Sequence, residues 1–199
     1  ISADGEYITA GSFDYKAYLF DKDSSTPLWS YTTGAFVYSV DISADGEYVV
    51  VGSMDNKVYL FDKDSSTPLW SYAADDDMPG VAISANGEYI VAGSYDNKVY
   101  LFDKDSSTPL WSYESVDDVD TVSISADGEY IVAGSDDDYV YLFDKDSSTP
   151  LWKYDTTGNV YSVDISADGE YIVAGSNLKV YLFDKDSSTP QWTLSLIHI

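Results

Sequence analysis

The chain has 199 residues, of which 44% are hydrophobic and 16% aromatic, so it is long enough and apolar enough to fold around a core. Its formal net charge of −25 disfavours nucleic acid and anionic membrane surfaces as partners, because an acidic surface repels phosphate groups. There is no Cys, which excludes disulfides and thiolate chemistry, and no apolar run of about 18 residues that could insert into a membrane.

A short stretch recurs along the chain at a nearly constant period. Residues 62–70 read Asp-Lys-Asp-Ser-Ser-Thr-Pro-Leu-Trp, and this stretch occurs five times, with Gln191 replacing Leu in the last copy. The Trp residues that end the copies are 41, 41, 41 and 40 residues apart: Trp29, Trp70, Trp111, Trp152 and Trp192. Such a period predicts a repeat architecture. The repeats begin at residues 1, 42, 83, 124 and 165, and they predict one domain over residues 1–192.

Each repeat contains four segments that read as short strands. In the second repeat we expect strand A over residues 37–43, strand B over 48–53, strand C over 57–62 and strand D over 69–72. An Asp-Gly turn joins A to B, and strands B and C are apolar on both faces, as in strands that are buried on both sides. No helical periodicity is present. The pattern predicts an all-β fold, a β-propeller with five four-stranded blades of about 41 residues. Because the first repeat lacks strand A, we expect nineteen strands.

Two known repeat families share parts of this pattern. Ser43-Ala44-Asp45-Gly46, Val51-Gly52-Ser53 and Val58-Tyr59-Leu60-Phe61-Asp62 resemble the WD40 repeat, although the Gly-His pair of that family is missing and Phe-Asp replaces its Trp-Asp. Asp62, Thr67, Leu69 and Trp70 are similar to the docking motif of the PQQ-like (quinoprotein) blade. Both resemblances imply a propeller, and they leave the activity open because these families share a scaffold and little else.

The recurring stretch has a structural and a metal-binding interpretation. In the structural one, Asp62, Asp103 and Asp144 cap backbone amides, and the five Trp rings are buried against the adjacent blade. In the other, Asp62-x-Asp64-x-Ser66 begins a calcium loop. Thr67 and Ala73, however, stand where such a loop needs Gly and a bidentate Glu. We therefore favour the structural role and expect neither a metal nor a cofactor.

The repeats differ mainly in the B–C turn and in the link from strand D to the next strand A. In an up-and-down sheet these two segments lie at the same end, and variation from repeat to repeat on one face is typical of a binding face. Neutral drift in exposed loops is the alternative. The candidate partner-binding residues in these segments are Phe13, Tyr15, Phe36, Met54, Asp75, Asp76, Asp77, Met78, Tyr95, Asp117, Asp118, Asp136, Asp137 and Asp138. Asp120 lies in the same segment as Asp117 and Asp118.

Aromatic side chains beside carboxylates suit a basic, partly apolar ligand. We therefore expect a non-catalytic scaffold that binds a protein or peptide through this face. The only histidine, His198, lies in a C-terminal segment that we expect to be non-native, so no Ser-His-Asp set is present. The sequence also has no phosphate-binding loop and no His/Cys metal cluster. Two alternatives remain: a propeller domain of a larger PQQ-like redox or hydrolytic enzyme, and a cell-surface or cation-binding module.

Both ends of the chain depart from the repeat. Ile1 enters in the middle of a repeat, and after Trp192 the expected Ser-Tyr gives way to Thr193-Leu194. Because residues 194–199 resemble the translation of a transposon sequencing adapter, we expect residues 193–199 to be the non-native tail of a fragment. The five blades either close into a ring, with residues 193–199 as the missing strand A, or form an arc of a larger propeller. The arc would have open blade edges that allow self-association.

Overall fold

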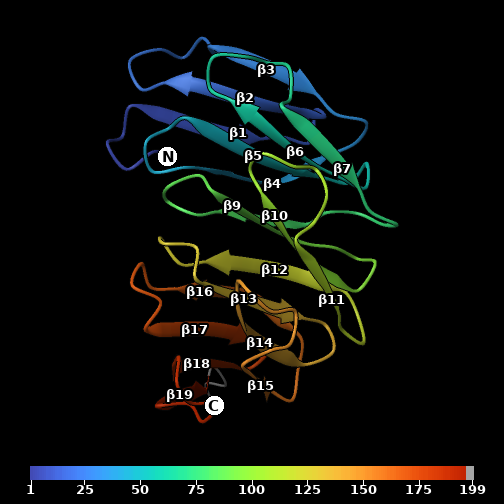
Figure 1. Ribbon diagram of the computed structural model, residues 1–199, viewed down its shortest axis with the longest axis vertical. Helices are drawn as coiled ribbons and strands as arrows, with labels where there is room; N and C mark the ends of the chain where they lie inside the picture. Colours follow the sequence, from blue (N-terminus) through green and yellow to red (C-terminus); the bar gives the residue numbers. More distant parts are fainter. Residues whose placement is uncertain (196–199) are drawn as a thin grey trace.

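The computed structural model describes residues 1–195, in which every regular element is a β-strand (Figure 1). No helix in this part of the chain could span a membrane. The strands, in chain order, are β1 (Tyr7–Gly11), β2 (Lys16–Asp21), β3 (Trp29–Thr32), β4 (Val37–Ile42), β5 (Tyr48–Ser53), β6 (Lys57–Asp62), β7 (Trp70–Ala73), β8 (Gly80–Ile83), β9 (Tyr89–Gly93), β10 (Lys98–Asp103), β11 (Trp111–Glu114), β12 (Val119–Ile124), β13 (Tyr130–Ser135), β14 (Tyr139–Asp144), β15 (Trp152–Asp155), β16 (Val160–Ile165), β17 (Tyr171–Ser176), β18 (Lys179–Asp184) and β19 (Trp192–Ser195).

The strands form five separate antiparallel sheets in simple up-and-down order. The first sheet is β1-β2-β3, and the four others are β4-β5-β6-β7, β8-β9-β10-β11, β12-β13-β14-β15 and β16-β17-β18-β19. The sheets follow one another along the longest axis of the molecule, with β1–β3 at one end and β16–β19 at the other (Figure 1). Each sheet is one blade, so the predicted all-β propeller with five blades and nineteen strands is confirmed.

The strand boundaries follow the sequence pattern closely. In the second blade β5 and β6 have the predicted bounds, β4 ends one residue early, and β7 begins and ends one residue late. Gly46, in the Asp-Gly turn between β4 and β5, has a φ of 76°, a conformation that glycine adopts without strain. The pairing of β4 with β5 shifts register between Val37 and Ser39, which is a bulge at the start of β4.

The hydrophobic core is divided among the four contacts between neighbouring blades. Between the second and third blades, for example, Val50 and Leu60 pack with Ile90 and Phe102, and all four side chains are fully buried. Because each middle blade has such a layer on both sides, strands B and C must be apolar on both faces.

The Trp residue of each of the first four blades connects that blade to the next one. Its indole Nε1 donates a hydrogen bond of 2.7–2.8 Å to a main-chain carbonyl in the C–D loop of the next blade, at Lys63, Lys104, Lys145 and Lys185. Its ring also lies 5.2–5.4 Å, between centroids, from a Phe of that blade: Phe61, Phe102, Phe143 and Phe183. The recurring stretch therefore ends in an anchor between blades.

The two ends of the row of blades are not joined in the described residues. Residues 193–195 of the predicted tail pair with β18 as part of β19, the fourth strand of the last blade. The alternative in which they serve as strand A beside β1 is therefore wrong for these three residues, and β1 pairs with β2 alone within residues 1–195. The rest of the predicted tail, residues 196–199, lies outside the described residues.

Candidate functional site

The B–C turns and the D–A links lie together at one end of the blades, which we call the variable face. The main-chain N–H of Ala74, in a link, donates to the carbonyl of Asn56 in a turn at 2.9 Å, and the N–H of Met54 donates to Phe36 at the same distance. At the opposite end, the uniform face, the N–H of Lys63 in a C–D loop donates to Glu47 in an A–B turn at 2.9 Å. Strand topology thus places the two loop sets as the sequence predicts.

Four exposed aromatic side chains from the first two blades form a patch on the variable face. The Phe13 ring lies 4.7 Å from that of Phe36 and 5.5 Å from that of Tyr38, and the Tyr15 ring lies 5.3 Å from Phe36. Phe13 is 63% exposed and Tyr38 is 50% exposed, so the rings contact one another without being covered. We call these four residues the aromatic patch. Exposed apolar groups gathered in this way are typical of a binding surface.

A group of carboxyls from the fourth blade lies near Tyr95 on the same face. Burial, together with a hydrogen bond to Asp136 and the charge of that carboxylate, raises the pKa of Asp120 to about 7. Burial and a hydrogen bond with Asp120 raise the pKa of Tyr95 to about 12, and the nearby Tyr38 contributes to this rise. Tyr95 therefore contacts this group of carboxyls.

The raised pKa of Asp120 predicts a pH-dependent stability. The folded-state pKa lies above that of an unfolded Asp, about 4, so ionisation of Asp120 opposes folding. The contribution of the neutral Asp120 carboxyl to stability is fully present below about pH 4 and is lost as the pH rises through about 7. We expect Asp120→Asn to raise the melting temperature by several degrees at pH 8 and to give no such gain at pH 4. Thermal melts followed by circular dichroism measure this, with the exposed Glu114→Gln as a control for the loss of one charge.

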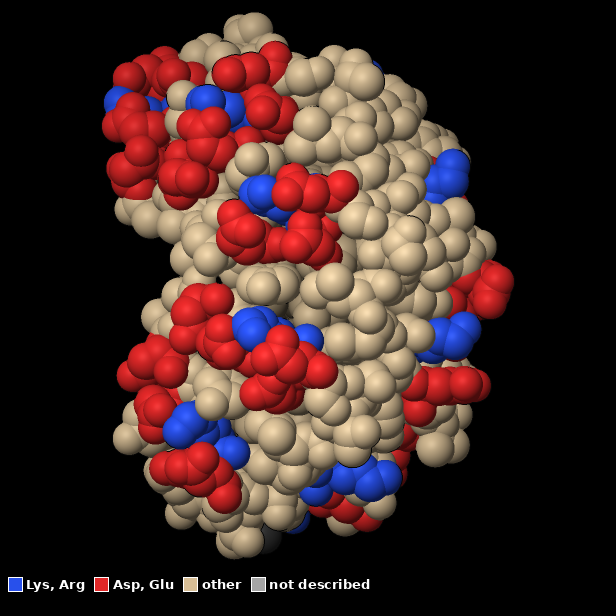
Figure 2. Space-filling view, in the orientation of Figure 1, with Lys and Arg blue, Asp and Glu red and all other residues tan. Residues whose placement is uncertain are grey.

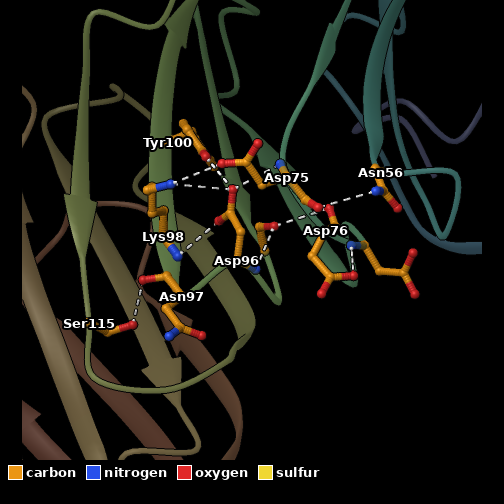
Figure 3. Close-up of polar contacts among 10 residues, drawn as sticks. Asn56, Asp75, Asp76, Asp96, Asn97, Lys98, Tyr100 and Ser115 are labelled. Carbon is orange, nitrogen blue, oxygen red and sulfur yellow. Dashed lines mark hydrogen bonds and ion pairs between the residues drawn. The ribbon is translucent and has the colours of Figure 1, made fainter.

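A second set of Asp residues on this face holds neighbouring blades together. Asp96 accepts hydrogen bonds from the Tyr100 hydroxyl at 2.6 Å and from the main-chain N–H of Asp75, in the preceding link, at 3.2 Å. Its side chain is 4% exposed, and the ammonium group of Lys98 lies 3.7 Å away (Figure 3). Asp55 and Asp137 occupy the same repeat position, and each binds its own Tyr and a link N–H.

The candidate partner-binding residues divide into free and occupied side chains. Met78 is wholly buried among the core residues of the second and third blades, so its predicted exposure on the variable face is wrong. Asp137 is half-buried and bonded as described above, so it is not free for a partner either. Met54, Asp77, Tyr95, Asp118, Asp136 and Asp138 are half-buried, whereas Phe13, Tyr15, Phe36, Asp75, Asp76 and Asp117 are exposed.

On the uniform face the recurring carboxylates bind their own loops. The side chain of Asp62 accepts the main-chain N–H of Asp64 at 2.9 Å, and Asp103 and Asp144 do the same in their blades at 2.8 Å. Lys63 lies 2.8 Å from the Glu47 carboxylate, and Figure 2 shows acidic and lysine side chains gathered in mixed clusters of this kind. Within residues 1–195 no group of three or more His, Cys, Asp or Glu side chains could hold a metal ion.

The five antiparallel sheets define a β-propeller, and comparison with known families identifies its PQQ-like kind. A family model described as outer membrane protein assembly factor BamB matches residues 14–126 and residues 96–197. These matches cover most of the chain, so the chain belongs to this family, and the resemblance to the PQQ-like blade is confirmed. No curated protein matches the chain.

Sequence reasoning missed two features of the variable face. Tyr38 joins the aromatic patch from β4, although the sequence pattern placed it within strand A and not among the loop residues of the variable face. The bonds of Asp55, Asp96 and Asp137 did leave a signal, because each lies four residues before a strand C Tyr. In the last blade, where Asn177-Leu178 replaces the turn, Tyr181 donates to the Thr156 carbonyl instead.

Proposed function

We propose that the chain is a non-catalytic propeller that binds a basic, partly apolar segment of a protein partner through its variable face. The observation that carries this proposal is the aromatic patch, because its rings are exposed although other Phe and Tyr side chains of the chain are buried in the core. Aromatic residues that remain exposed in a group supply contact area at interfaces.

Exposed carboxylates on the same variable face support a basic ligand. Asp75, Asp76 and Asp117 are exposed, and the side chain of Asp75 is 91% exposed although Lys98 lies 3.7 Å away. A Lys or Arg side chain of the partner could approach these carboxylates while its stem, or a neighbouring aromatic residue, contacts Phe13 or Tyr38. The net charge of −25 would attract such a partner from a distance.

Two further considerations favour binding over catalysis. The family is described as an outer membrane protein assembly factor, and such a factor has protein partners. In addition, Asp55, Asp96 and Asp137, the carboxylates that recur on this face, are used in bonds between blades rather than presented to a substrate.

Calorimetric titration with Lys/Arg- and aromatic-containing peptides selected from an array tests the proposal. The double variant Phe13→Ser, Phe36→Ser is expected to weaken binding by tenfold or more, because it removes two of the four rings of the patch. Leu28→Ser, which changes an exposed apolar side chain in a loop of the uniform face, should leave the affinity unchanged. If no basic peptide binds better than its acidic counterpart, or if the two variants lose affinity equally, the proposal is wrong.

A further inference from the structure

One face of the last blade is exposed. In each of the other blades, the corresponding face is covered by the next blade. Val173 in β17 is 37% exposed, whereas the residues at the same repeat position, Val50, Val91 and Val132, are fully or almost fully buried. Tyr171 and Trp192 are exposed in the same way, at 48% and 47%. Together with Leu182, Val173 and Tyr171 line a shallow apolar hollow on this blade. We call this surface the donor face.

The first blade has the complementary face exposed. Ile8 in β1 is 37% exposed, whereas Ile90 and Ile131 at the same repeat position are fully buried. Ile8 pairs directly with Phe20 of β2, so the two side chains lie on the same side of the sheet. Within 4 Å of the Cβ position of Gly5 there are no atoms, whereas Gly46 is covered by the Tyr7 ring of the preceding blade. We call this surface the acceptor face.

The contact that would join these two faces already occurs four times within the chain. At each internal contact a Trp indole donates to a Lys carbonyl of the next blade, and a Tyr ring covers a turn glycine. An Ala N–H also donates to an Ala carbonyl of the next blade at 2.9–3.1 Å, in the pairs Ala3–Ala44, Ala44–Ala85, Ala85–Ala126 and Ala126–Ala167. The donor face of the last blade and the acceptor face of the first blade each have the residues for one side of this contact, and both faces are exposed.

We propose that the donor face of one copy docks on the acceptor face of a second copy, head to tail. Trp192 would then donate to the Lys22 carbonyl, Tyr171 would cover Gly5, and the Ala167 N–H would reach the Ala3 carbonyl. The two sheets associate through their faces, in the manner of successive blades, rather than through their edges. Because the two surfaces differ, the contact is heterologous and builds closed rings or open chains of copies.

Two features make this contact weaker than an internal one. The acceptor face lacks the strand A side chains that Val160 and Val163 supply to the contact between the fourth and fifth blades. The donor face carries Leu194 where the other blades have a Tyr, so one aromatic contact is lost. Each copy also has a net charge of −25, and the resulting repulsion is screened by salt. We therefore expect reversible association that strengthens as the salt concentration rises.

Sedimentation equilibrium of the full chain over a range of concentrations tests this. The mean mass of the wild type should rise with concentration, and more steeply at about 0.5 M than at about 0.05 M salt. Val173→Asp on the donor face and Ile8→Asp on the acceptor face should each raise the dissociation constant at least tenfold. Val116→Asp, the same change at a residue that is 83% exposed on the variable face, should behave as the wild type.

Mixing the two blocked variants provides the decisive control. Each variant retains one intact face, so an equimolar mixture of Val173→Asp and Ile8→Asp should form a dimer and nothing larger. Matching thermal melts establish that the variants fold, and Trp192→Ser replaces Val173→Asp if that variant does not. The proposal is overturned by a wild type that stays monomeric at all concentrations and salt conditions, by a single blocked variant that associates normally, or by a mixture that stays monomeric.

Discussion

Replacing Phe102 by Ala is expected to lower the free energy of unfolding by about 3–5 kcal/mol. The Phe102 side chain is wholly buried between the second and third blades, with its ring centroid 5.4 Å from that of Trp70 and 5.2 Å from that of Tyr72. Removal of the ring loses its buried apolar surface and leaves a cavity that the two stiff sheets cannot close by moving together. Urea unfolding followed by circular dichroism measures the loss.

The chain supplies a matched control for this prediction. Phe20 has the same repeat position in the first blade, where no preceding blade covers it and the side chain is only half-buried. At concentrations too low for association, Phe20→Ala should cost about 1 kcal/mol, a value typical of partly exposed positions. An equal loss in the two variants would show that burial between two blades does not account for the cost of removing the Phe102 ring.

The fold could be predicted because the same local signals occur in every repeat. The apolar runs of β5 and β6 each have turn residues on both sides, so their bounds follow directly from the sequence. Strand D was harder to delimit, because Leu69 is apolar but lies exposed after Pro68, outside β7. Apolar character alone does not distinguish a core position from an exposed loop position.

The candidate site was less predictable because burial in a loop depends on the neighbouring blade. Met78 lies in a link, and its main-chain N–H donates to the Ser53 carbonyl at 3.1 Å, which places its side chain between two sheets. The spacing of residues in one repeat carries no information about this contact. The exposed rings of Phe13 and Phe36 were identified because variation among the copies at these positions was visible in the sequence itself.

Replacing Asp96 by Ala should lower the free energy of unfolding by about 1.5–3 kcal/mol, although Asp96 lies on the face where the sequence varies. The variant leaves the hydroxyl of Tyr100, a side chain that is 3% exposed, without its 2.6 Å acceptor. It also removes the acceptor for the Asp75 N–H and so loosens the link to the preceding blade. A buried hydroxyl that loses its partner costs more than the net value of the bond, because water cannot replace the lost acceptor.

The loss is expected even though the substitution removes one negative charge from a chain with a net charge of −25, a change that by itself relieves repulsion. Asp14→Ala is the matched control: Asp14 also accepts a Tyr hydroxyl, that of Tyr18, but it is exposed in the first blade, where no link from a preceding blade reaches it. Asp14→Ala should lower the free energy of unfolding clearly less than Asp96→Ala does, and urea unfolding of both variants measures the difference. If Asp96→Ala is as stable as Asp14→Ala, the carboxylate does not hold the blades together, and Asp96 becomes available as a ligand-binding group of the variable face.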